Sequence, residues 1–188
     1  ANMKSADSCV MGIGINYFTN AIHIRYVTSG KMYPDELYEE MFRMRQAIGA
    51  HIIGVEVTGL EEFIKQPLMN EMLRRGIENM CEFVWLKARG GDPQGDKGKI
   101  KRIGSLVPYY RQRFIYHNKE QCRKLEGQLL DFPRANLIDC ADAEAYVVEL
   151  LELGGRYFHS PEEDPNDIEH EYAGLDYDSP LDDSYRRI

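Results

Sequence analysis

The fold of this chain is indicated most clearly by residues 52–86, which read IIGVEVTGLEEFIKQPLMNEMLRRGIENMCEFVWL. Ile52 to Val57 and Cys81 to Leu86 are short apolar runs rich in β-branched and aromatic residues, a composition typical of strands. The segment between them predicts a helix from about Leu60 to Arg75. A strand, a helix and a second strand in succession indicate an α/β domain.

The residues before this unit predict a hairpin and a helix. Ser8 to Ile15 and Ala21 to Thr28 are apolar or alternating runs joined by a short polar turn, which indicates two antiparallel strands. Pro34 to Ile48 begins with proline and two acidic residues and carries apolar residues at helical spacing, and Gly49 follows it. We therefore expect the first helix to cover these residues.

The residues after the unit predict a loop and three further elements. Residues 88–98 contain four glycines and a proline, which indicates a loop. Residues 99–111 look helical as far as Pro108, and Phe114 to His117 form a short apolar strand. Lys119 to Leu130 and Ala141 to Leu153 have the apolar spacing of helices.

Length and charge indicate one domain, residues 1–159, with a flexible acidic tail, residues 160–188. The tail holds ten acidic residues and two arginines, so its net charge equals the −8 of the whole chain. The neutral body can therefore carry a basic face for nucleic acid, and basic residues gather between Lys87 and Arg113. No apolar run approaches the roughly 20 residues that span a bilayer, and the four scattered cysteines predict reduced thiols rather than a zinc site.

Carboxylates occur where a fold normally avoids them. Glu56 interrupts a strand expected to be buried on both faces, Asp7 precedes the first strand, and Asp139 and Asp142 stand at the head of the last helix. A buried carboxylate is costly unless a cation pairs with it. Carboxylates from separate segments can converge on Mg²⁺ or Mn²⁺, and a two-metal site hydrolyses phosphodiesters.

Each carboxylate also has an ordinary structural interpretation. Asp7 would be a solvated residue at a strand edge, Asp139 a cap of the last helix, and Asp142 a complement to that helix's dipole. For Glu56 the alternative is an ion pair with a basic residue, Arg25 or Lys65.

Five segments in the second half of the chain follow one another in a known order. They are KIKRI at 99–103, LVPYY at 106–110, FIYH at 114–117, LEGQLLDFP at 125–133 and DCADA at 139–143. Their order and spacing resemble the nuclease domain of the large terminase subunit of tailed phages (caudoviruses), in the ribonuclease-H-like superfamily. Ala6-Asp7 before the first strand and Gly54-Val-Glu56 in the third extend the resemblance more loosely over the N-terminal half.

The resemblance implies a ribonuclease-H-like fold, a mixed central sheet flanked by helices. It also implies a metal-dependent endonuclease that cuts concatemeric double-stranded DNA with little sequence preference during viral genome packaging. The metal ligands would be Asp7, Glu56 and Asp139, with Asp142 as a further catalytic residue because Ile138 replaces the first aspartate of the family's pair. The family's principal first-strand aspartate would lie two residues before Ala1.

The resemblance further implies where the domain acts. DNA contacts are expected from five basic residues, Arg89, Lys97, Lys99, Lys101 and Arg102; their ordinary interpretation is a solvated helix face. Other expected partners are a preceding terminase ATPase domain, the portal and the small terminase subunit, in the host cytoplasm at the procapsid portal rather than in the mature virion. No membrane contact is expected, and His117 is interpreted as a surface residue.

Two other functions remain open at this point. A different ribonuclease-H-like nuclease, such as a junction resolvase, would use the same chemistry on branched DNA. A DNA-grasping or portal-docking module with a vestigial metal site would bind without cutting, and the isoleucine at position 138 favours it.

Overall fold

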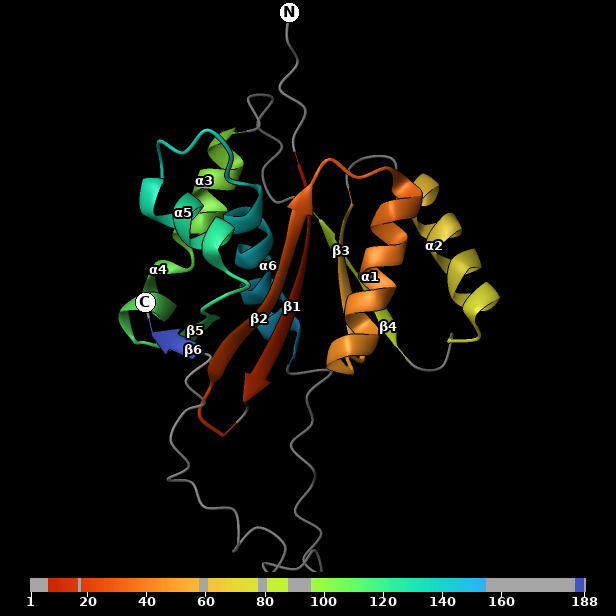
Figure 1. Cartoon of the computed structure of the whole chain (residues 1–188), viewed down its shortest axis with the longest axis horizontal. Helices are drawn as coiled ribbons and strands as arrows, with labels where there is room; N and C mark the ends of the chain where they lie inside the picture. The colour runs from red at the N-terminus through yellow and green to blue at the C-terminus, as the bar shows by residue number, and fades with distance from the viewer. Residues whose placement is uncertain are drawn as a thin grey trace, which may run out of the picture.

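Strands and helices alternate along the chain in the computed structural model, which describes residues 7–16, 18–57, 61–77, 81–87, 96–154 and 185–187 (Figure 1). The elements in chain order are β1 (Ser8–Asn16), β2 (Ala21–Gly30), α1 (Pro34–Ile48), β3 (Ile52–Val57), α2 (Glu61–Arg75), β4 (Glu82–Lys87), α3 (Asp96–Gly104), α4 (Val107–Arg111), β5 (Ile115–Asn118), α5 (Arg123–Asp131), α6 (Asp139–Gly154) and β6 (Tyr185–Arg187). The protein is therefore α/β, as the sequence predicts.

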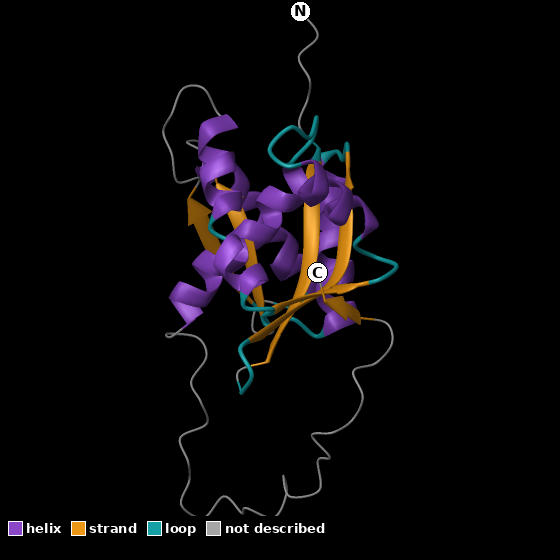
Figure 2. Ribbon diagram, turned by 90° about the vertical axis from the view of Figure 1, so that its left-hand side faces the viewer, coloured by secondary structure: helices purple, strands orange, loops and turns teal. Residues whose placement is uncertain are grey.

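The strands of the described residues form two sheets. The larger sheet has the order β1-β2-β5-β6: β1 and β2 are the predicted antiparallel hairpin, β5 runs parallel to β2, and β6 runs antiparallel to β5. The smaller sheet is the parallel pair β3–β4. Figure 2 shows the two groups of strands apart from each other. The mixed sheet flanked by helices is confirmed, and β6 is an addition that the sequence did not predict.

Most element boundaries agree with the sequence within about two residues, but α5 begins at Arg123 rather than at the predicted Lys119. The helix predicted from Lys99 as far as Pro108 is two helices, α3 and α4, separated at Ser105 and Leu106, and α4 continues past Pro108 to Arg111. The last helix begins two residues earlier than predicted, at Asp139. Of the predicted loop, residues 88–95 lie outside the described residues and 96–98 belong to α3. In the acidic tail only residues 185–187 are described.

The smaller sheet lies between two groups of helices. Phe42 of α1 and Leu68 and Met72 of α2 pack with one face of β3–β4. Tyr146 and Leu150 of α6 pack with the other. Figure 1 shows α1 and α2 together on one side of the molecule and α3 to α6 together on the other. The two faces of β3–β4 are therefore covered by helices from opposite ends of the chain.

Helix α6 also forms part of the main core. Its buried residues Ala141, Ala145 and Val147 pack with β2, β5, α3 and α5 in one cluster. Gly54 of β3 makes close approach of α6 possible, because a Cβ there would lie 2.8 Å from Leu86 Cδ1 and 3.2 Å from Leu150 Cδ1. One helix thus joins the two sheets.

The prediction that β3 is buried on both faces is wrong. Gly54 and Glu56 are exposed, whereas Val57 is buried. The reason is that β3 pairs with β4 at one edge, while a pocket lies between β3 and β1. Because Glu56 is exposed, its carboxylate is not removed from water as the prediction of a fully buried strand implied.

The interpretation of His117 as a surface residue is also wrong, because its side chain is fully buried. Its Nε2 lies 2.9 Å from the Tyr110 hydroxyl, which donates a 2.6 Å hydrogen bond to the buried Glu144. Its Nδ1 lies 3.6 Å from Glu126 Oε1. Burial, followed by the Glu144 carboxylate, raises the pKa of Tyr110, so the phenol stays a hydrogen-bond donor.

Replacement of Tyr110 by phenylalanine is expected to lower the free energy of unfolding by about 1–3 kcal/mol, because it leaves the buried Glu144 carboxylate without this donor. Equilibrium unfolding in urea measures the change. Tyr109→Phe removes a hydroxyl from the neighbouring, half-buried tyrosine and serves as the matched control. Equal stability of the two variants would show that the Tyr110 hydrogen bond contributes nothing.

Candidate functional site

A pocket of about 710 Å³ lies between β1, α1, β3 and α6. Much of its wall is apolar, from residues such as Met11, Met41 and Leu86. Its polar residues include the predicted carboxylates and one predicted DNA-binding lysine: Asp7, Glu56, Lys99, Asp139 and Asp142. Residues from β1, β3, α3 and α6 therefore share one pocket.

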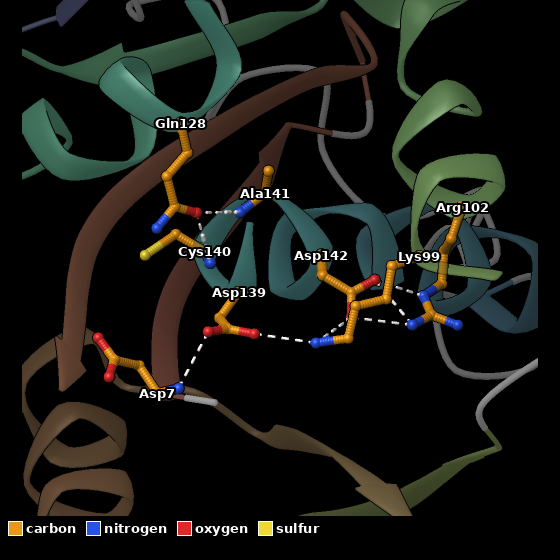
Figure 3. Close-up of polar contacts among 8 residues, drawn as sticks. All are labelled: Asp7, Lys99, Arg102, Gln128, Asp139, Cys140, Ala141 and Asp142. Carbon is orange, nitrogen blue, oxygen red and sulfur yellow. Dashed lines mark hydrogen bonds and ion pairs between the residues drawn. The ribbon is translucent and has the colours of Figure 1, made fainter. Parts of the chain in front are cut away.

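Asp139 is the first residue of α6, and its carboxylate is free of the capping role that the sequence allowed. The amide groups of Cys140 and Ala141 donate instead to Gln128 Oε1 of α5, at 2.8 and 3.2 Å. Asp139 accepts a 2.9 Å hydrogen bond from the backbone amide of Asp7 and another of 2.9 Å from Lys99 Nζ (Figure 3). Gln128 thus satisfies the helix terminus while Asp139 faces the pocket.

Asp142 lies one helical turn after Asp139 and forms a bidentate pair with Arg102 of α3. Arg102 Nε and Nη2 donate to its two carboxylate oxygens at 2.8 and 2.9 Å. The side chains of Arg102 and Asp142 are 11% and 5% exposed. The guanidinium also lies over the Tyr146 ring, 4.5 Å from its centroid. These contacts fix Arg102 in place, so the solvated interpretation does not apply to it.

Lys99 lies between the two aspartates. Its Nζ is 2.9 Å from Asp139 Oδ1 and 3.7 Å from Asp142 Oδ2. Burial lowers the pKa of Lys99, but Asp139, Asp142 and Glu56 together outweigh burial and raise it above its usual value. The ammonium is therefore held in its charged form by carboxylates from two elements.

Glu56 completes the acidic part of the pocket from the side of β3. Its charge favours the protonated forms of both Lys99 and Arg102. Burial, then Glu56, raises the pKa of Tyr146 on α6. The basic partner Lys65 considered for Glu56 lies over the Trp85 ring, 5.1 Å from its centroid.

Asp7 takes part through its backbone rather than its carboxylate. Its side chain accepts a 3.1 Å contact from Lys124 Nζ. Figure 3 shows the carboxylate directed away from Asp139. The solvated-edge interpretation does not fit this side chain, which is 14% exposed and paired with Lys124, and the backbone amide of Asp7 donates to Asp139.

The predicted DNA-binding residues fall into three groups. Lys99 and Arg102 are paired with aspartates, and Lys101 is exposed on the same helix. Lys97 belongs to α3, but its side chain is outside the described part of the structure. Arg89 lies outside the described residues altogether.

Two features beside this cluster could not be predicted from the sequence. Gln128 caps α6 from another helix, and no local motif marks such a residue. Cys9 and Cys140 are 131 positions apart in the chain, yet their side chains hydrogen-bond to each other. This contact raises the pKa of Cys9 and lowers the pKa of Cys140 to about 7. All four cysteines are free. Only the fold brings these groups to the start of α6.

The cluster has the donor chemistry for a hard divalent cation, because carboxylate oxygens are the ligands that Mg²⁺ and Mn²⁺ prefer. Asp139 and Asp142 already bind a cation, the ammonium of Lys99. Within the described ranges, no three His, Cys, Asp or Glu side chains lie close enough to hold a metal as placed. The residues therefore fit a metal by chemistry, and Lys99 stands in the position of the cation.

Comparison of the chain with protein-family models, curated proteins and solved structures finds no match. Among the described helices, none is both long and apolar enough to cross a membrane.

Replacing Gln128 with alanine is expected to destabilise the fold by about 1–3 kcal/mol, since two amides at the buried start of α6 lose their acceptor. Thermal or urea unfolding followed by circular dichroism measures the loss. The exposed Gln121→Ala is the matched control and should change stability by less than about 0.5 kcal/mol. An unchanged Gln128→Ala variant would mean that water caps the helix equally well.

Proposed function

We propose that this chain is the nuclease domain of a viral DNA-packaging terminase and hydrolyses phosphodiester bonds of concatemeric double-stranded DNA with a divalent metal. The observation that carries the proposal is the meeting of Glu56, Asp139 and Asp142 at one pocket. Glu56 comes from β3 and the two aspartates from the first turn of α6, which are segments far apart in the chain. The terminase-like sequence pattern of residues 99–143 also implies that Asp139 and Asp142 are site residues and that Lys99 contacts DNA.

Each residue of the pocket has a role in this proposal. Asp139, Asp142 and Glu56 would hold Mg²⁺ or Mn²⁺, in a two-metal site that activates a water and stabilises the leaving oxygen. Arg102 orients Asp142 by its bidentate pair. The backbone amide of Asp7 orients Asp139 from the start of β1. Asp7 is in this way a positioning residue rather than a metal ligand as placed.

Helix α3 would present the DNA backbone to the carboxylates. Lys99 stands at the pocket and Lys101 is exposed two residues later. Lysine contacts with phosphates supply affinity without reading the sequence. This agrees with a nuclease that has little sequence preference.

The same proposal includes the finer fold and the partners. An antiparallel hairpin followed by a strand parallel to β2 is compatible with a ribonuclease-H-like sheet. The partners would be duplex DNA, a preceding ATPase domain, the portal and the small terminase subunit. The place of action would be the host cytoplasm at the procapsid portal.

The test is plasmid nicking and linearisation with Mn²⁺, with Mg²⁺ and with chelator. The 188-residue chain is compared with a longer chain that begins several residues before Ala1, where the resemblance places one more aspartate. We expect metal-dependent cutting that falls at least about 100-fold in Asp139→Asn and Glu56→Gln, because each would remove a charge from the metal site.

The matched control is Glu82→Gln, which changes an exposed glutamate of the neighbouring strand β4 outside the pocket and should cut at the wild-type rate. Equal activity of Glu56→Gln and Glu82→Gln would remove Glu56 from the site. Tight duplex binding without cutting by both chains would favour a docking module. Cleavage restricted to branched DNA would favour a junction resolvase.

A further inference from the structure

The two cations of the acidic cluster are held in different ways. Arg102 is bidentate, 11% exposed and stacked over Tyr146. Lys99 is 29% exposed and makes one short contact, to Asp139 Oδ1, and one of 3.7 Å to Asp142. A planar guanidinium with two hydrogen bonds is fixed, whereas an ammonium on a flexible four-carbon stem can move. Lys99 is therefore the exchangeable member of the cluster.

The position of Lys99 conflicts with metal binding at the same oxygens. Its ammonium occupies the space between Asp139 and Asp142, and Glu56 adds to the negative potential that holds it there. A divalent ion bound to those carboxylates would repel the ammonium at close range. The ion and Lys99 consequently compete for the cluster.

We propose that Lys99 closes the carboxylate site in the absence of DNA and opens it when backbone phosphates of a duplex draw the ammonium out. Divalent metal and duplex DNA would then bind with positive coupling, each raising the affinity for the other. This inference rests on the proposed function and adds to it a regulation of the same site. Metal would then occupy the cluster chiefly when substrate is present.

The first experiment measures Mn²⁺ binding to the full chain without DNA, by titration calorimetry at low ionic strength. Lys99→Met is expected to bind Mn²⁺ about tenfold more tightly than the wild type, because a charge-assisted contact no longer competes. Lys101→Met, on the same helix but exposed, should bind within about twofold of the wild type. Asp139→Asn in the Lys99→Met background should lose the gained affinity, which locates the ion at this cluster.

A second measurement uses the wild-type chain, so the test survives if Lys99→Met fails to fold. Fluorescence anisotropy gives the affinity for a short duplex in chelator and in Ca²⁺, a divalent cation used here as a probe. Exchange at Lys99 predicts tighter duplex binding in Ca²⁺, whereas simple screening of phosphate contacts predicts weaker binding. If Lys99→Met folds, the ratio of its duplex affinity in Ca²⁺ to its duplex affinity in chelator should fall towards one.

The outcomes separate this inference from the proposed function. If the wild type cleaves DNA with metal but Lys99→Met binds Mn²⁺ no more tightly than the wild type, the proposed competition between Lys99 and metal is wrong. The proposed nuclease function would be unaffected by that result. Weaker duplex binding in Ca²⁺ would also overturn the exchange. Absence of both Mn²⁺ binding and cleavage in every chain would overturn both proposals.

Discussion

The ion pair between Arg102 and Asp142 is the interaction on which the arrangement of this protein depends. It links α3 to α6 through two side chains that are almost fully buried, and the Tyr146 ring packs against the guanidinium. Helix α6 in turn packs against the main core with one set of residues and against β4 with another. A buried pair of this kind contributes more to the geometry of a site than to net stability, and losing one partner alone is costly.

The strands and helices could be predicted because each has a local cause. The hairpin follows from alternation along β1 and β2, and α1 from a proline with acids at its start and a glycine at its end. The exposure of Glu56 and the burial of His117 could not be predicted. Both depend on which strands lie side by side: β3 is left beside a pocket, whereas β5 lies between β2 and β6.

The carboxylates of the candidate site could be predicted from the sequence, but the residues that contact them could not. The resemblance points to Asp7, Glu56, Asp139 and Asp142, and all four line one pocket, but the Asp7 carboxylate pairs with Lys124 instead of joining the others. The pairing of each basic side chain with its carboxylate depends on how α3 packs against α6. Lys99 and Arg102 each lie 40 residues before the aspartate they contact. The cap from Gln128 depends likewise on how α5 meets α6. Long-range contacts of this kind leave no periodic signal in the sequence.

Strand β6 has a consequence for how copies of the chain behave towards one another. Its three residues hydrogen-bond to β5, so the far end of the chain covers a strand edge that would otherwise be open on that side. An open edge is a template for strand addition by a neighbouring molecule, and a very short terminal strand offers little for another chain to extend. By occupying this edge of β5, residues 185–187 thus guard against edge-to-edge aggregation between copies of the chain.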